Sequence, residues 1–199
     1  MPLPSECDLR QGIRNWGELG NDRDADCVPA ATEHLEMVHN LDATSTWKKL
    51  LYRIGFRPPH AGFTLELYTQ YLATQGEKPG PDVGVVQQNW FTWLKAQGKI
   101  VDFEQITAPP ITPDAIKQLM IEWKGCLLGL FLTENAYQNY WKNESWDIRV
   151  GEKPNPALNH AVALVSYHGS DYGVVTWGQM KTMTESFLTA CVYGVWVFK

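Results

Sequence analysis

The sequence predicts an α+β fold in which helices fill the N-terminal half and strands the C-terminal half. Helical periodicity dominates up to about residue 97, whereas short apolar runs bounded by turn residues dominate after it. Helices and strands segregated in this way pack as a helical part against a mostly antiparallel sheet. We expect one domain over residues 1–199, helical over about 20–97 and β-rich over about 98–199.

The first helical pattern begins at Cys27 and extends to about residue 41. Apolar side chains recur there on one face, Asp26 is suited to the N-cap, and Pro29 fits the first turn. Residues 5–26 are polar and punctuated by glycine, which predicts a long loop. The same reasoning predicts three further helices in this half, over 46–54, 64–75 and 87–97.

One more helix and five strands are expected in the second half. Thr112 followed by Pro113 indicates a capped helix that ends at Trp123. The strands are predicted where apolar and β-branched residues run between turn signals. Their predicted ranges are 99–106, 126–132, 160–167, 172–177 and 192–198, with a turn at 168–171.

Composition excludes several classes of function. The chain is 44% apolar and 20% charged, with no apolar run long enough to span a membrane. A net charge of −5 and the absence of a basic run argue against nucleic acid as a partner. The N-terminus lacks the pattern of a secretory signal, so we expect a cytoplasmic location. Some of the nine tryptophans can line a groove for peptide or sugar.

The four cysteines are expected to be thiols, because disulfides are rare in the cytosol, and none of them forms a C-x-x-C metal or redox pair. Cys126 and Cys191 stand in apolar strands and are predicted to be core residues. His34 and His39 are five positions apart, which spreads them around a helix and does not favour a metal site. No metal and no cofactor are expected.

Cys27 and His160 are the candidate catalytic residues. A cysteine at a helix N-terminus meets a positive dipole and free N–H groups, which favour the nucleophilic thiolate. His160 opens a predicted strand and is a candidate base. Two structural alternatives stay open, because a lone cysteine is often a small buried residue and His160 can be a core histidine.

Two distant segments carry a family resemblance. Residues 8–10 (DLR) lead to Gly20 and Cys27, and His160 follows within 159–167 (NHAVALVSY). In order and spacing these segments resemble the papain-like cysteine peptidases. The resemblance implies a papain-like fold, Cys27 as nucleophile and His160 as base and later general acid. It also implies that Asn21 donates to the oxyanion, at a position where the family usually has glutamine.

The residue that orients the histidine departs from the family pattern. The family places an asparagine shortly before a tryptophan, but residues 174–178 here read VVTWG. Counting from His160 puts Thr176 in this position, and aligning on the tryptophan puts Val175 there. Thr176 can accept the imidazole N–H, and Asp22 or Asp26 are alternatives. A carboxylate at Asp26 would also raise the pKa of the adjacent thiol.

The segments GND at 20–22, DC at 26–27 and MT at 183–184 resemble a branch of this group that is common in bacteriophage genomes. This resemblance implies a phage-encoded cysteine hydrolase, a peptidase or amidase. Its partners would be a protein, a peptide or a cell-wall peptide. The alternative is a catalytically impaired papain-like protein that serves as a structural component of the virion and contacts other virion proteins.

Overall fold

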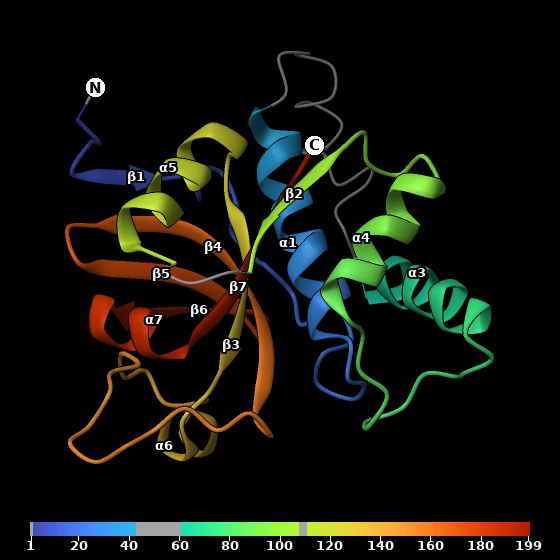
Figure 1. The fold of residues 1–199 in the computed structure, drawn as a ribbon. Coiled ribbons are helices and arrows are strands. Elements are labelled where there is room, and N and C mark those ends of the chain that lie inside the picture. Colours follow the sequence, from blue (N-terminus) through green and yellow to red (C-terminus); the bar gives the residue numbers. More distant parts are fainter. Residues whose placement is uncertain (1, 43–60, 108–110) are drawn as a thin grey trace.

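The computed structural model describes residues 2–42, 61–107 and 111–199, and within them an antiparallel sheet carries helices on both faces (Figure 1). The strand order is β2-β7-β3-β4-β5-β6, and β1 also pairs with β4, beyond the end of β3. The strands are β1 (Glu6–Asp8), β2 (Phe103–Ile106), β3 (Cys126–Phe131), β4 (Asn159–His168), β5 (Asp171–Thr176), β6 (Gln179–Thr184) and β7 (Val192–Phe198).

The helices divide between the two faces of the sheet. In Figure 1, α1, α3 and α4 lie on one side and α5 and α7 on the other. Helix α1 packs directly against β4. The helices are α1 (Cys27–Asp42), α3 (Ala61–Thr74), α4 (Gln87–Ala96), α5 (Pro113–Trp123), α6 (Glu134–Gln138) and α7 (Glu185–Cys191).

Each face of the sheet has its own hydrophobic core, because successive residues of a strand point to opposite faces. In β4, Ala161 and Ala163 face the core shared with α1, α3 and α4. Val162 and Leu164 face the core shared with α5 and α7. The sheet is therefore buried on both sides, which explains why β4 and β7 read as almost continuous apolar runs.

The predicted α+β class is confirmed, and so are most of its elements. Helices α1, α4 and α5 and strands β3, β4, β5 and β7 lie where the sequence placed them, to within a few residues. Helix α3 begins three residues before the predicted 64, and β2 covers only the second half of 99–106. The predicted helix over 46–54 lies outside the described residues.

Four short elements were not predicted: β1, β6, α6 and α7. Strand β1 lies within the predicted loop over 5–26, and only its pairing with β4 makes it a strand. The two helices follow threonine caps. Thr133 Oγ1 accepts the N–H of Ala136, and Thr184 Oγ1 accepts the N–H of Phe187. These threonines were available in the sequence as capping signals.

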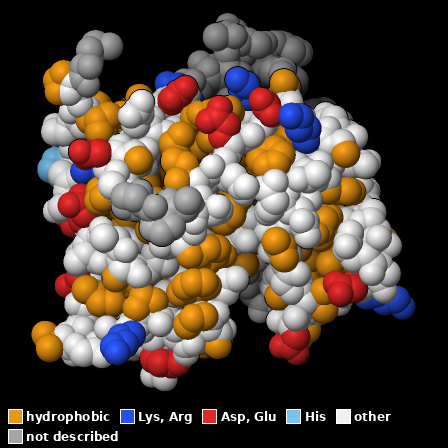
Figure 2. Space-filling model, viewed as in Figure 1, with side chains coloured by type: hydrophobic (Ala, Val, Ile, Leu, Met, Phe, Trp, Pro, Cys, Tyr) orange, Lys and Arg blue, Asp and Glu red, His pale blue; other side chains and the backbone are white. Residues whose placement is uncertain are grey.

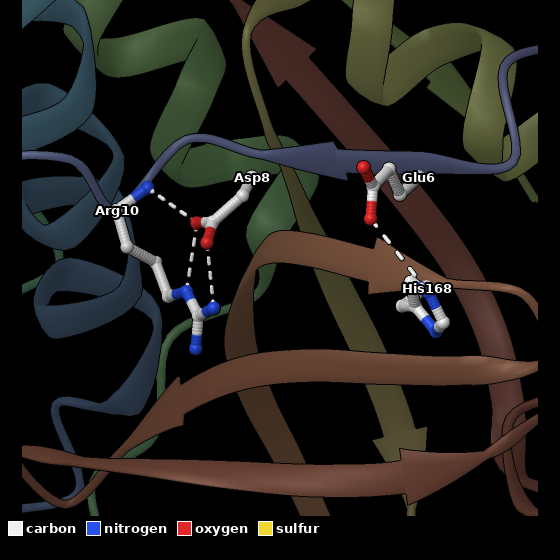
Figure 3. Close-up of polar contacts among 4 residues, drawn as sticks. All are labelled: Glu6, Asp8, Arg10 and His168. Atoms are coloured by element: carbon white, nitrogen blue, oxygen red, sulfur yellow. Dashed lines mark hydrogen bonds and ion pairs between the residues drawn. The ribbon is translucent and has the colours of Figure 1, made fainter.

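The start of the chain carries two exposed polar contacts, and one of them joins it to the end of β4 (Figure 3). The Asp8 carboxylate accepts two hydrogen bonds from the Arg10 guanidinium, at 2.7 and 2.6 Å. Glu6 faces His168 across the strand pair, with 3.7 Å between carboxylate and imidazole. Exposed pairs of this kind contribute little stability, so the hydrogen bonds between β1 and β4 are the main attachment.

In the view of Figure 1, the space-filling surface is indented at its lower edge, between the sheet side and the side that carries α3 and α4 (Figure 2).

Within the described parts of the chain, no helix combines the length and apolar character needed to cross a membrane.

Candidate active site

Cys27 is the first residue of α1 and is partly buried where this helix meets β4. Burial raises the pKa of its thiol to about 11. A backbone hydrogen bond from Ala161 and the helix N-terminal amides lower the pKa, while Asp26 raises it. The helix N-terminus alone therefore does not produce a thiolate, contrary to the expectation from position. The resting thiol carries its proton at neutral pH.

Asp26 precedes the helix and is completely buried. Its backbone carbonyl accepts the first helical hydrogen bond, from Ala30 N, so it occupies the N-cap position. Its carboxylate oxygens have no hydrogen-bond partner within the described chain, so the predicted side-chain cap is wrong. Burial, together with Asp24 and Asp22, raises the pKa of this carboxyl to about 8.

His160 is the second residue of β4, and its side chain is held by two neighbours from the β5–β6 hairpin. Its Nε2 lies 2.7 Å from Thr176 Oγ1, and its ring stacks on the Trp177 indole with centroids 4.1 Å apart and planes inclined by 10°. Burial lowers the pKa of the imidazole to about 3. The imidazole is therefore neutral, and Nδ1 is the ring nitrogen left for chemistry.

Of the candidates for orienting His160, the structure places Thr176 against the ring. The carboxylate of Asp26 makes no hydrogen bond in the described structure, and Asp22 lies 3.9 Å from the Arg23 guanidinium. The stacking of Trp177 on the imidazole was not predicted from the sequence. Its position directly after Thr176 was the available signal.

The turn of the β5–β6 hairpin fixes Trp177 over the imidazole. Trp177 and Gly178 both have positive φ, 45° and 70°, as in the two-residue hairpin turns that match strand twist. Positive φ is uncommon for a large residue and is concentrated at functional sites. Gly178 is also required by space, since a Cβ there would lie 2.8 Å from the backbone of Gly17 and of Glu18.

The loop before α1 is anchored on the opposite side by His34, a buried residue of α1. His34 Nε2 lies 3.0 Å from the carbonyl oxygen of Gly17, so this nitrogen carries the proton and donates. Burial lowers the pKa of His34 to about 4, which keeps the ring neutral. At Gly20, with φ of 108°, a Cβ would lie 2.8 Å from both Asp26 and Leu65. The loop is thus packed closely between α1 and the hairpin.

Asn21 lies in this loop and is partly buried. It lines a cavity of about 230 Å³ together with Thr176 and Trp177, which we call the Trp177 cavity. The remaining lining comes from the loop before α1, from Tyr140 and Trp141, and from β6. Asn21 thus lines the same cavity as Thr176 and Trp177, which both contact His160. Its role as oxyanion donor stays a prediction.

The structure brings the helix of Cys27 and the strand of His160 into direct contact. The backbone amide that bonds to the sulfur belongs to Ala161, the residue after His160. No hydrogen bond joins the thiol to the imidazole in the part of the chain that is described. The Cys27–His160 pair therefore stays a prediction. It is supported by the contact between the start of α1 and the backbone of β4 next to His160.

A polar network near Cys27 was not foreseen from the sequence. The Tyr193 hydroxyl donates to Asn159 Oδ1 at 2.7 Å and accepts a hydrogen bond from the Gln87 amide. Burial raises the pKa of this phenol, and a charge on Cys27 would raise it further. The network links α4, β7 and the residue before His160. Only the fold brings these residues together.

Comparison with solved structures assigns the fold. Xylellain, a cysteine protease from Xylella fastidiosa, aligns over 100% of this chain and 87% of its own with a TM-score of 0.56 and 13% identity. The Carica candamarcensis cysteine protease CMS1MS2, solved in complex with E-64, aligns over 99% of both chains with a TM-score of 0.52 and 16% identity. No family profile and no curated protein matches the sequence. The chain thus has the papain-like fold, as predicted.

Proposed function

We propose that this chain is a cysteine hydrolase that cleaves a peptide or amide bond through a thioester on Cys27, with His160 as its base. The observation that carries the proposal is the setting of His160. Its neutral imidazole is held by Thr176 and Trp177 on the strand that packs against the N-terminus of the Cys27 helix. Both solved neighbours are described as cysteine proteases.

The proposed reaction starts from a neutral thiol and a neutral imidazole. For His160 Nδ1 to accept the thiol proton, Nε2 must carry the other proton and donate it to Thr176 Oγ1. As Sγ of Cys27 attacks the substrate carbonyl, the proton moves to Nδ1 and an oxyanion forms. Asn21 is the proposed donor to this oxyanion.

Collapse of the tetrahedral intermediate breaks the C–N bond, and the imidazolium returns its proton to the leaving amine. The acyl group stays on Cys27 as a thioester. Water then attacks this thioester while His160 accepts a proton from it, and the thiol is regenerated as the acid product leaves. Because the thiolate is not formed in advance, proton transfer must accompany the attack.

The source of the chain and the class of its substrate are also proposals. The resemblance of residues 20–22 and 26–27 to phage-encoded chains supports a phage as the source, and a protein, peptide or cell-wall peptide as the substrate. The alternative, a virion component without catalysis, predicts an unreactive Cys27, so one experiment separates the two functions.

That experiment is intact-mass analysis after treatment with iodoacetamide at pH 7, followed by peptide mapping. We expect one fast adduct, at Cys27, because Cys126 and Cys191 are buried and Cys7, whose pKa is raised by burial, has no base proposed beside it. His160→Ala should slow this labelling by roughly ten-fold or more through loss of the base. His168→Ala, which changes an exposed histidine at the far end of the same strand, is the matched control. Labelling that is absent at Cys27, or unaffected by His160→Ala, would refute the proposal.

A further inference from the structure

The Trp177 cavity lies on the imidazole side of the proposed nucleophile. Thr176 and Trp177 both line the cavity and both contact His160. In amide cleavage the imidazole gives its proton to the leaving amine, so the residue that follows the scissile bond must sit close to His160. Its side chain is therefore placed at this cavity. The volume of about 230 Å³ is a space suited to one long side chain.

Aromatic rings form one wall of the cavity. Tyr140 packs on Trp177 with centroids 4.2 Å apart, and Trp141 stands beside them with 64% of its surface exposed. Exposed aromatic side chains gathered at a cavity usually mark a contact site. Aromatic faces also attract cations, and tryptophan does so most strongly.

Carboxylates form part of the rim of the cavity. Glu18 and Asp22 line the cavity from the loop before α1, and both are exposed. The contact between Asp22 and Arg23 is 3.9 Å long and lies in solvent, so it neutralises Asp22 only weakly. The loop is held by the close approach of Gly178 to the backbone of Glu18, so this rim is fixed relative to Trp177.

One cation also lines the cavity, and it is already engaged. Lys181 is 7% exposed, and its ammonium group donates to the carbonyl oxygens of Lys142 and Glu144. Burial lowers the pKa of Lys181, although Glu144 opposes this shift. Two carboxylates line the cavity against this one engaged ammonium group. The Lys142 ammonium group lies 5.5 Å from the centroid of the Trp141 ring, so an incoming cationic head would displace it from that ring.

We infer that the Trp177 cavity selects a basic side chain, lysine or arginine, on the leaving-group side of the scissile bond. The inference rests on the proposed function for its place in the reaction. The aliphatic stem of such a residue would pass along Trp177 and Tyr140, and its cationic head would lie between Trp141 and the carboxylates of Glu18 and Asp22.

The test uses full-length Cys27→Ala protein, which cannot turn over, and two neutral-backbone probes, N-acetyl-lysine N-methylamide and its norleucine counterpart. Binding is followed by the indole N–H signals of ¹⁵N-labelled protein, with those of Trp141 and Trp177 assigned from Trp141→Phe and Trp177→Phe. We expect the lysine probe to shift these signals and to bind roughly ten-fold more tightly than norleucine. Glu18→Gln combined with Asp22→Asn should remove most of this preference, whereas Glu104→Gln, on distant β2, should not.

Equal binding of the two probes, or a preference unchanged by the double variant, would overturn the inference. An N-acetylglucosamine oligomer that shifts the same signals while the lysine probe does not would assign the cavity to sugar and equally overturn it. Iodoacetamide labelling of Cys27 is measured in parallel on Glu18→Gln combined with Asp22→Asn in a chain that keeps Cys27. Normal labelling with no lysine preference refutes only the cavity assignment, while lost labelling in the wild-type chain refutes the hydrolase.

Discussion

His160 Nε2 lies 2.7 Å from the Thr176 hydroxyl oxygen, so the residue that counting from His160 puts in place of the family's asparagine does contact the imidazole. A hydroxyl can accept the imidazole N–H just as an amide oxygen does. The departure from the family pattern at residue 176 therefore does not remove the orienting hydrogen bond. It replaces the acceptor with a shorter side chain that is itself buried.

Thr176→Val should keep the shape of the site and remove the acceptor. His160 Nε2 would then be buried without a partner, at a cost of about 1–3 kcal/mol. We expect kcat/KM for amide hydrolysis to fall roughly ten- to hundred-fold, because the imidazole loses the acceptor that orients it and stabilises the imidazolium formed during the attack. Thr176→Ser, which retains the hydroxyl, should stay near wild type, and Thr182→Val, at an exposed position of β6, controls for the substitution. Equal losses in the Ser and Val variants would argue that Thr176 only packs.

Trp177 makes two separable contributions, its ring and its backbone. Trp177→Ala and Trp177→Gly both delete the stack on His160 and should lower kcat/KM alike. Only glycine adopts φ of 45° without strain, so Trp177→Gly should be more stable than Trp177→Ala by about 1 kcal/mol. Urea denaturation of the two variants measures this difference. Trp177→Phe, which keeps an aromatic ring, should lose less activity than either. If Trp177→Phe were as inactive as Trp177→Ala, the role assigned to the stack would be contradicted.

The sequence was sufficient to predict those parts of the fold and site that depend on local pattern. Cys27 at a helix start, His160 at the beginning of a strand and the division into helices and sheet follow from periodicity and capping signals. Thr176 was one of several candidates, because its distance from the imidazole depends on the register of β4 against β5, which includes a bulge between Leu164 and Ser166.

The features that were missed depend on tertiary structure. Strand β1 has only three residues and no signal apart from its pairing with β4. The network of Gln87, Tyr193 and Asn159 joins residues more than 30 positions apart. The pKa of Cys27 was expected to fall because of the helix N-terminus. Burial opposes that effect, and burial cannot be read from position alone.

Asp26→Asn should stabilise the protein at neutral and alkaline pH. Burial raises the pKa of the folded carboxyl to about 8, above its value near 4 in the unfolded chain. The folded state thus holds this proton more tightly. The associated stability is complete below pH 4 and is lost as pH rises towards 8, by an amount on the order of 5 kcal/mol. An amide at this position has no proton to lose.

The measurement is the free energy of unfolding of wild type and Asp26→Asn at pH 4.5 and pH 8. His34 and His160, whose pKa values are lowered, destabilise both proteins as pH falls below 6.5, and this common effect cancels in the difference. We expect a large advantage for the variant at pH 8 that shrinks at pH 4.5. Asp82→Asn, at an exposed aspartate, is the matched control for the substitution. A constant difference at both pH values would mean that Asp26 is ionised in the folded protein.

The pH dependence of Cys27 alkylation should have two components. Between about pH 5 and 8 the imidazole is already neutral, because its pKa is lowered to about 3, so base-assisted attack on iodoacetamide should proceed at a nearly constant rate. Above pH 8 direct reaction of the thiolate should add to it, and this part should keep rising towards pH 11, the raised pKa of the thiol. An unperturbed cysteine would instead level off near pH 9.

His160→Ala separates these components, because it should abolish the plateau and leave the alkaline rise. Asp26→Asn should move the rise to lower pH, since it removes a carboxylate that raises the pKa of Cys27. Rates are taken from peptide mapping of the Cys27 adduct, so that Cys7, which is also partly buried, does not contribute. A plateau that survives in His160→Ala would show that the imidazole does not reach the sulfur. A single inflection near pH 8.5 would show that neither burial nor Asp26 raises the pKa of the Cys27 thiol.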